Sequence, residues 1–159
     1  MTAEDSQSKK KKTAEKKDQP KTEGRRVPVA LLLGAWFVPG LGHWLLGKKK
    51  RAVVFSVVVF CAFVTGVLLH GEIGTPKPEN PFSWLAAFAC LGNGILAIAR
   101  LVWLNGFADF FGSLPFGLQG GGSPSAAGFA YGNTFLYTAG LMNLLAVLDV
   151  SDIARGEKD

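Results

Sequence analysis

The sequence predicts an all-α fold, an integral membrane helical bundle with three to four membrane helices, the first of them broken at Pro39-Gly40. Four apolar stretches carry this prediction, because each is close to the ~20 residues that a helix needs to cross a bilayer. These stretches cover residues 27–47, 52–69, 82–104 and 126–148. Carboxylates are also too scarce within 27–148 for the surface of a water-soluble domain. The region contains only Glu72, Glu79 and Asp109.

Residues 1–26 are polar, and we expect them to form a disordered cytoplasmic tail. Nine of the seventeen Lys and Arg residues lie in this segment. Basic residues beside membrane helices are retained on the cytoplasmic side, which predicts a cytoplasmic N-terminus. The same cations attract anionic lipid headgroups, so the lipid bilayer is the first expected partner. Aromatic residues do not alternate with these cations, and no nucleic-acid partner is expected.

The first apolar stretch, residues 27–47, contains no charged residue but is interrupted in its middle. A helix from Val27 to Val38 would extend only about 18 Å, short of a hydrocarbon core of roughly 30 Å. Proline and the glycines around it favour a break at this point. We therefore interpret one set of residues as a structural turn in a broken or re-entrant segment: Pro39, Gly40, Gly42, His43 and Gly47.

Charge leaves two topologies open for this stretch. A complete crossing would place the basic run 48–51 outside the cell, against the positive-inside rule. A turn at Pro39-Gly40 would keep both basic clusters cytoplasmic, and three later crossings would then place the C-terminus outside. Four complete crossings would instead put both termini inside. The charge distribution favours the turn.

The remaining stretches are predicted to be membrane helices at 52–69, 82–104 and 126–148, followed by a short charged tail, 149–159. Two kinds of side chain are expected to pack these helices together. Gly128 and Gly132 form a small-residue pair that permits close helix contact, either within the chain or between copies. Amide side chains on the later helices are expected to form hydrogen bonds between helices. They are Asn93, Asn133 and Asn143.

No cluster of residues specifies a reaction, and we expect no catalytic, cofactor or metal site. The favoured function is a noncatalytic structural or interaction module, which packs with a second copy or with an unidentified membrane partner. Two alternatives remain. The broken first segment fits a small transporter or channel component. His43 near a carboxylate such as Asp149 or Asp152 fits a membrane enzyme that uses this histidine as acid or base.

Two family resemblances support the membrane interpretation. The run Pro39-Gly40-Leu41-Gly42-His43, followed by Gly47, a basic turn and a long apolar helix, resembles the two-transmembrane domain family. Over most of residues 27–156 the chain is similar to a bacterial family of small multispanning proteins described as a domain of unknown function. That similarity rests on the PGLGH element joined to residues 131–145 and then to Asp149 and 152–154. The resemblance implies an inner-membrane protein and implies no activity.

Overall fold

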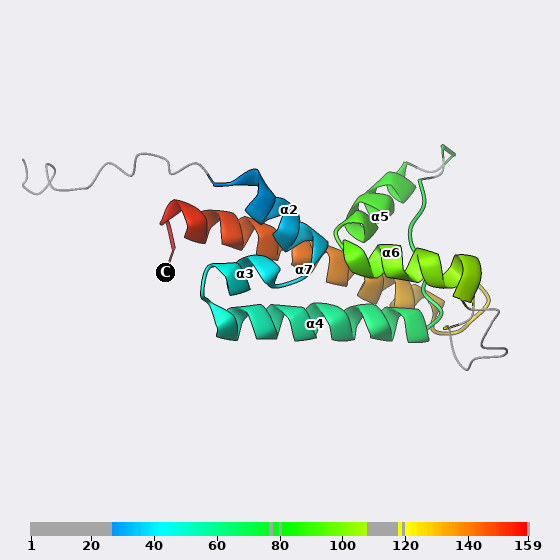
Figure 1. The fold of residues 1–159 in the computed structure, drawn as a ribbon. Coiled ribbons are helices and arrows are strands. Elements are labelled where there is room, and N and C mark those ends of the chain that lie inside the picture. Colours follow the sequence, from blue (N-terminus) through cyan, green and yellow to red (C-terminus); the bar gives the residue numbers. More distant parts are fainter. Residues whose placement is uncertain (1–26, 77, 80, 108–117, 119, 159) are drawn as a thin grey trace, which may run out of the picture.

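A computed structural model describes residues 27–158 except 77, 80, 108–117 and 119, and all regular secondary structure in this part of the chain is helical (Figure 1). The all-α prediction is therefore confirmed for these residues. The elements in chain order are α2 Val29–Phe37, α3 Leu41–Leu45, α4 Lys49–Leu68, α5 Phe82–Leu91, α6 Ile95–Val102, a π-helical turn η1 Trp103–Phe107, and α7 Phe129–Arg155. The expected tail, 1–26, lies outside the described residues.

The two long helices, α4 and α7, form an antiparallel pair that carries the other elements. They have 20 and 27 residues, and both are long and apolar enough to cross a membrane. Their shared core contains Val59, Phe63, Val67, Leu136 and Ala139. Glycines let the backbones approach near one end, where a Cβ on Gly66 would lie 2.8 Å from the carbonyl oxygen of Gly132. The pair forms the long axis of the molecule (Figure 1).

The first apolar stretch turns back, as the charge distribution favours. The end of α2 lies beside the middle of α7, where Trp36 contacts Asn143, whereas His43 in α3 lies beside Asp149, near the end of α7. Gly40 enables the reversal with a φ of +81°, which a residue with a Cβ rarely adopts. Its missing Cβ also leaves room for the carbonyl oxygen of Ala52.

The stretch 82–104, predicted as one continuous helix, differs in the structure. It consists of two helices, and Phe82–Leu91 and Ile95–Gly106 are bent by 100° relative to each other. Gly94 permits the bend with a φ of +54°. It also packs so closely on the end of α2 that a Cβ would lie 2.7 Å from the carbonyl oxygen of Phe37. After the bend, α6 runs back along α4 toward the end of the molecule where α5 begins (Figure 1).

The second bend changes the expected position of the C-terminus. If 82–104 were one crossing, the turn-back topology would place the C-terminal tail at the end opposite the basic run 48–51. Instead α7 extends to Arg155, seven residues beyond the predicted limit of 148, and Asp149 lies 4.0 Å from Arg51. The tail and the start of α4 therefore share one end of the molecule (Figure 1).

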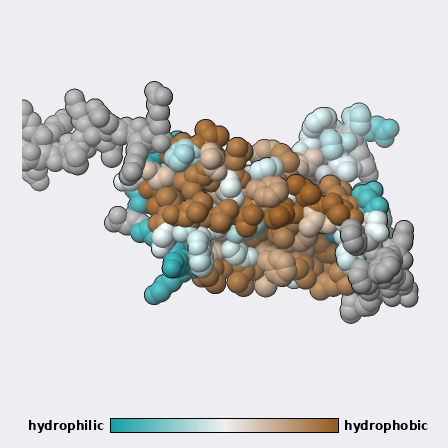
Figure 2. Space-filling model, viewed as in Figure 1, coloured by the Kyte–Doolittle hydropathy of each residue, from teal (hydrophilic) through white to brown (hydrophobic). Residues whose placement is uncertain are grey.

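The surface between the two ends is predominantly apolar. Figure 2 shows a broad hydrophobic face bounded by hydrophilic residues at the ends of the long axis. Large apolar side chains are exposed on α2, α4, α5, α6 and α7. Examples, one from each helix, are Leu33, Val54, Leu85, Ile98 and Leu145. Among the described residues, two helices can cross a membrane by length and composition, or three elements if the bent pair counts as one span.

Candidate functional site

The tips of the two bent segments meet inside the molecule at a site that we call the central junction, defined by Trp36, Gly92, Asn93, Gly94 and Asn143. Asn143 is fully buried in α7, and its Nδ2 donates to the carbonyl oxygens of Trp36 and Gly92, both at 2.8 Å. These carbonyls lie at the C-terminal ends of α2 and α5, where a helix leaves acceptors without internal partners. One side chain therefore ties both bends to α7.

Further side chains of the bends and their neighbours bond backbone carbonyls. Asn93 Nδ2 donates to Cys90 and to Leu136 on α7, at 3.2 and 3.1 Å. Trp36 Nε1 donates to the Leu91 carbonyl at 3.1 Å, which links α2 directly to α5. At the other tip, Ser56 Oγ on α4 donates to the Pro39 carbonyl at 2.7 Å.

Glycines let the backbones approach closely around the junction. A Cβ on Gly140 would overlap the carbonyl oxygen of Ala89, and a Cβ on Gly92 would overlap the carbonyl oxygen of Gly140. Helix α5 therefore rests on α7 at van der Waals distance between backbones. Such close packing is typical of helix contacts in membranes. The hydrophobic effect does not drive helices together there, and small residues allow the van der Waals contacts that do.

A second group lies at the end of the molecule that holds the tail, and we call it the terminal cluster: His43, Arg51, Phe55, Asp149 and Lys158. His43 is 0% exposed, and its Nε2 donates to Asp149 Oδ2 at 3.0 Å. Its ring stacks on Phe55 with 5.0 Å between ring centroids. The second carboxylate oxygen of Asp149 accepts from Lys158 Nζ at 2.8 Å, which raises the pKa of Lys158. The carboxylate thus joins α3, α7 and the tail.

The terminal cluster brings together the histidine and one of the two carboxylates considered from the sequence. Asp149, rather than Asp152, pairs with His43 across 106 positions of sequence. A His–Asp pair can orient an imidazole for proton transfer when the other ring nitrogen faces a substrate. Here the whole imidazole lies inside the protein. The pair links α3 to α7.

The other predicted residues lie at contacts within the chain. Asn133 Oδ1 accepts the backbone N–H of Glu72 at 2.7 Å, which fixes the loop after α4. Gly132 faces Gly66 and Gly71, and Gly128 precedes α7 against Leu69. Gly47 ends α3 with a φ of +77°, and Gly42 packs against Val150. Both glycines of the small-residue pair thus lie at contacts with the end of α4 and the residues that follow it.

Sequence reasoning missed three residues of the central junction, Trp36, Gly92 and Gly94, and two residues that contact the bends beside it, Ser56 and Gly140. A signal for one part of it was present. The run Gly92-Asn93-Gly94 places two poor helix formers around an amide in the middle of an apolar stretch, a pattern that favours a break even without proline. The partners of Trp36 and Ser56 depend on tertiary contacts and leave no local signal.

The fold and its two polar centres define a class of helical protein: an apolar two-helix frame with two short bent segments that meet in its interior. Residues 29–159 match the family model described as a family of unknown function (DUF6677), and the chain belongs to that family. This confirms the expected membership of a family of unknown function. Comparisons with curated proteins and with solved structures found no match to the chain.

Proposed function

We propose that the protein is a noncatalytic integral module of a bacterial inner membrane, with its N-terminus in the cytoplasm. In this proposal α4 and α7 cross the membrane, α2–α3 enters from the cytoplasmic face, and α5–α6 enters from the opposite face. Helix lengths support this placement. The nine residues of α2 and the ten of α5 extend about 14 and 15 Å, roughly half of a ~30 Å hydrocarbon core. Their tips therefore meet near mid-depth.

The observation that carries the noncatalytic role is the hydrogen bonding of the bends. In transporters, broken helices present freed backbone groups to an ion or substrate. Here the carbonyls of Trp36, Pro39, Leu91 and Gly92 are bonded by side chains of the same protein. Inside lipid such groups need partners, and these bonds supply them without a ligand. The bends therefore act as structural joints in this proposal.

The burial of His43 supports the same role over a membrane enzyme. A general acid or base must reach a substrate atom directly or through one water. His43 is 0% exposed behind Phe55 and Asp149, so its ring does not face a solvent-accessible space. We therefore assign this pair to fixing α3 against α7.

The expected partner of the module is a second copy or another membrane protein. Helix α5 packs on α7 through Ala89 and Cys90 and leaves half of its residues exposed. The exposed side chains are large and apolar: Phe82, Trp84, Leu85, Phe88 and Leu91. Membrane interfaces form by such packing, and we propose that this face of α5 contacts the partner. The basic tail and the run 48–51 contact anionic lipids.

Photo-crosslinking in native membranes tests the interaction role. A photoreactive amino acid at Leu85, which is 67% exposed on α5, is expected to give one reproducible protein adduct. The matched position is Leu145, which is 63% exposed on α7 and is expected to give lipid adducts only. Lipid adducts alone at both positions, with a monomeric mass in mild detergent, would overturn the proposal.

Reconstitution tests the transport alternative. Proteoliposomes that contain the intact protein are expected to show the same ion and solute leakage as empty vesicles. A selective flux that is lost in the Asn143→Ala variant would show that the central junction serves transport rather than structure.

A further inference from the structure

A cleft of about 460 Å³ opens at the end of the molecule that holds the tail. Its walls come from the first turns of α4 and from the C-terminal tail. The lining side chains are Lys50, Arg51, Val54, Phe55, Asp149 and Lys158. The cleft thus combines cations with apolar side chains at the boundary of the apolar surface.

Asp149, the one carboxylate that lines the cleft, orients the cations but does not neutralise all of their charge. Asp149 bonds Lys158 and His43 through its two oxygens, and Arg51 lies 4.0 Å away. Lys158 and Arg51 keep 58% and 45% of their side chains exposed. Lys50 forms no ion pair with a described residue. Three cations against one carboxylate leave the cleft positive, and Arg and Lys side chains favour a phosphate group at such a place.

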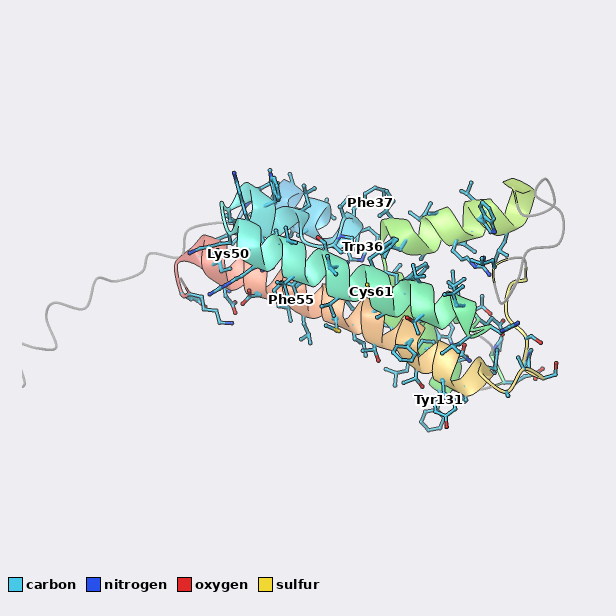
Figure 3. All side chains as sticks on the ribbon, turned by 90° about the horizontal axis from the view of Figure 1, so that it is seen from below. Trp36, Phe37, Lys50, Phe55, Cys61 and Tyr131 are labelled. Atoms are coloured by element: carbon cyan, nitrogen blue, oxygen red, sulfur yellow. The ribbon has the colours of Figure 1, made fainter. Side chains whose placement is uncertain are left out.

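An apolar stripe leads from the cleft along the outside of α4. Val54 is 60% exposed and Val58 is 41% exposed, and Cys61 follows one turn later, also exposed. Residues three and four apart lie on one face of a helix, so these side chains form a continuous row. Figure 3 shows Lys50, Phe55 and Cys61 in order along α4, from the charged end inward.

We propose that this cleft binds an anionic phospholipid from the membrane leaflet. The phosphate lies among Lys50, Arg51 and Lys158, and one acyl chain follows the row from Val54 to Cys61. The apolar row favours a lipid over a soluble phosphate compound, because a soluble compound has no acyl chain that could pack against it. This inference rests on the proposed placement of the protein in a membrane, and it assigns a specific lipid site beyond the general attraction of the basic tail.

Native mass spectrometry of the purified full chain in detergent tests the site with two lipids of identical acyl chains. Phosphatidylglycerol is expected to remain bound at concentrations where phosphatidylcholine dissociates. The cleft variant Lys50→Gln/Arg51→Gln/Lys158→Gln is expected to bind phosphatidylglycerol at least about tenfold more weakly, since it removes all three cations that face the phosphate.

The matched control removes three cations at the same end but outside the cleft: Lys48→Gln/Lys49→Gln/Arg155→Gln. It is expected to change the affinity less than about twofold. Equal losses in the two triple variants would overturn the proposal, because they would show only nonspecific attraction. The single variant Lys50→Glu covers the case in which the cleft triple fails to fold, because it removes no ion pair of Asp149.

Two further arms separate the remaining outcomes. If glycerol phosphate competes for the cleft as well as phosphatidylglycerol does, the cleft binds a soluble anion and the lipid proposal is wrong. Alkaline extraction of membranes separates failure of this site from failure of the proposed function. A protein that stays in the extracted membranes but prefers neither lipid would refute the cleft alone.

Discussion

His70 is the one described residue other than glycine with a positive φ, +64°, and it lies where α4 ends. Two bonds close this end, from the N–H of Gly71 to Gly66 and from the N–H of His70 to Val67. This pattern is a Schellman motif, whose left-handed position usually holds glycine. Gly47 and Gly156 fill the same position after α3 and α7, with φ of +77° and +78°. The backbone of His70 is therefore strained, because it carries a Cβ at a positive φ, whereas Gly47 and Gly156 do not.

Replacement of this residue with glycine is expected to stabilise the protein. His70→Gly removes the clash of a Cβ in the left-handed conformation and should raise the free energy of unfolding by about 1 kcal/mol. Unfolding by denaturing detergent, followed by circular dichroism, measures the change. His70→Ala keeps a Cβ and serves as control, since it should give no gain. A gain of equal size in both variants would show that the imidazole, and not the backbone, causes the strain.

Two glycines in helices are expected to respond to alanine with opposite signs. Gly140→Ala places a methyl group against the Ala89 carbonyl and should destabilise the protein by about 1–3 kcal/mol as α5 is pushed off α7. Gly34→Ala meets only Leu41 at 3.6 Å and should add up to about 1 kcal/mol from helix propensity. Thermal unfolding in detergent compares the two. Equal signs would contradict the backbone contact between α5 and α7.

At the scale of the element, two amides of α7 hold other parts of the chain with opposite ends of their side chains: Asn143 holds the two bends and Asn133 holds the loop after α4. Asn143 donates two bonds through Nδ2 at the central junction, whereas Asn133 accepts one bond through Oδ1 from Glu72. An Asn→Asp change removes donors and keeps acceptors. The same substitution therefore distinguishes the two roles.

Asn143→Asp is expected to destabilise the protein by more than about 2 kcal/mol, because two buried carbonyls lose their donor and a buried carboxylate takes its place. Asn133→Asp should cost less than about 1 kcal/mol, because its accepting oxygen remains. Chemical unfolding and limited proteolysis of the α5–α6 segment measure both effects. If Asn133→Asp is as damaging as Asn143→Asp, the amide of Asn143 is not the joint between the bends.

The sequence predicts one of the two bends and misses the other for a physical reason. Pro39 removes a backbone donor and is flanked by glycine, so it breaks a helix by its own chemistry. Gly92 and Gly94 only weaken a helix, and the break there depends on contacts with Gly140 and with the end of α2. The sequence predicts that His43 lies near a carboxylate such as Asp149 or Asp152. The choice between Asp149 and Asp152 depends on where α3 packs along α7, which is a tertiary contact.

At the scale of the whole molecule, the chain reverses twice. Each of the two short segments, α2–α3 and α5–α6, returns to the end of the molecule at which it starts. Of the helices that the structure describes, only α4 and α7 run the full length, so the basic run 48–51 and the C-terminal tail share one end (Figure 1). With one reversal, the tail would lie at the other end from the basic run. The position of residue 155 relative to residue 49 therefore reports directly on the second bend.

Cysteine labelling in intact cells tests this arrangement. In a Cys61→Ala background, Lys49→Cys and Arg155→Cys are expected to be equally protected from a membrane-impermeant maleimide, while Ser125→Cys, in the exposed segment before α7, reacts. Cys90 stays in place because it is buried and bonded by the N–H of Gly74. Permeabilised cells should label all three engineered positions. Labelling of residue 155, while residues 49 and 125 stay protected, would show that α5 and α6 form a single crossing in the membrane.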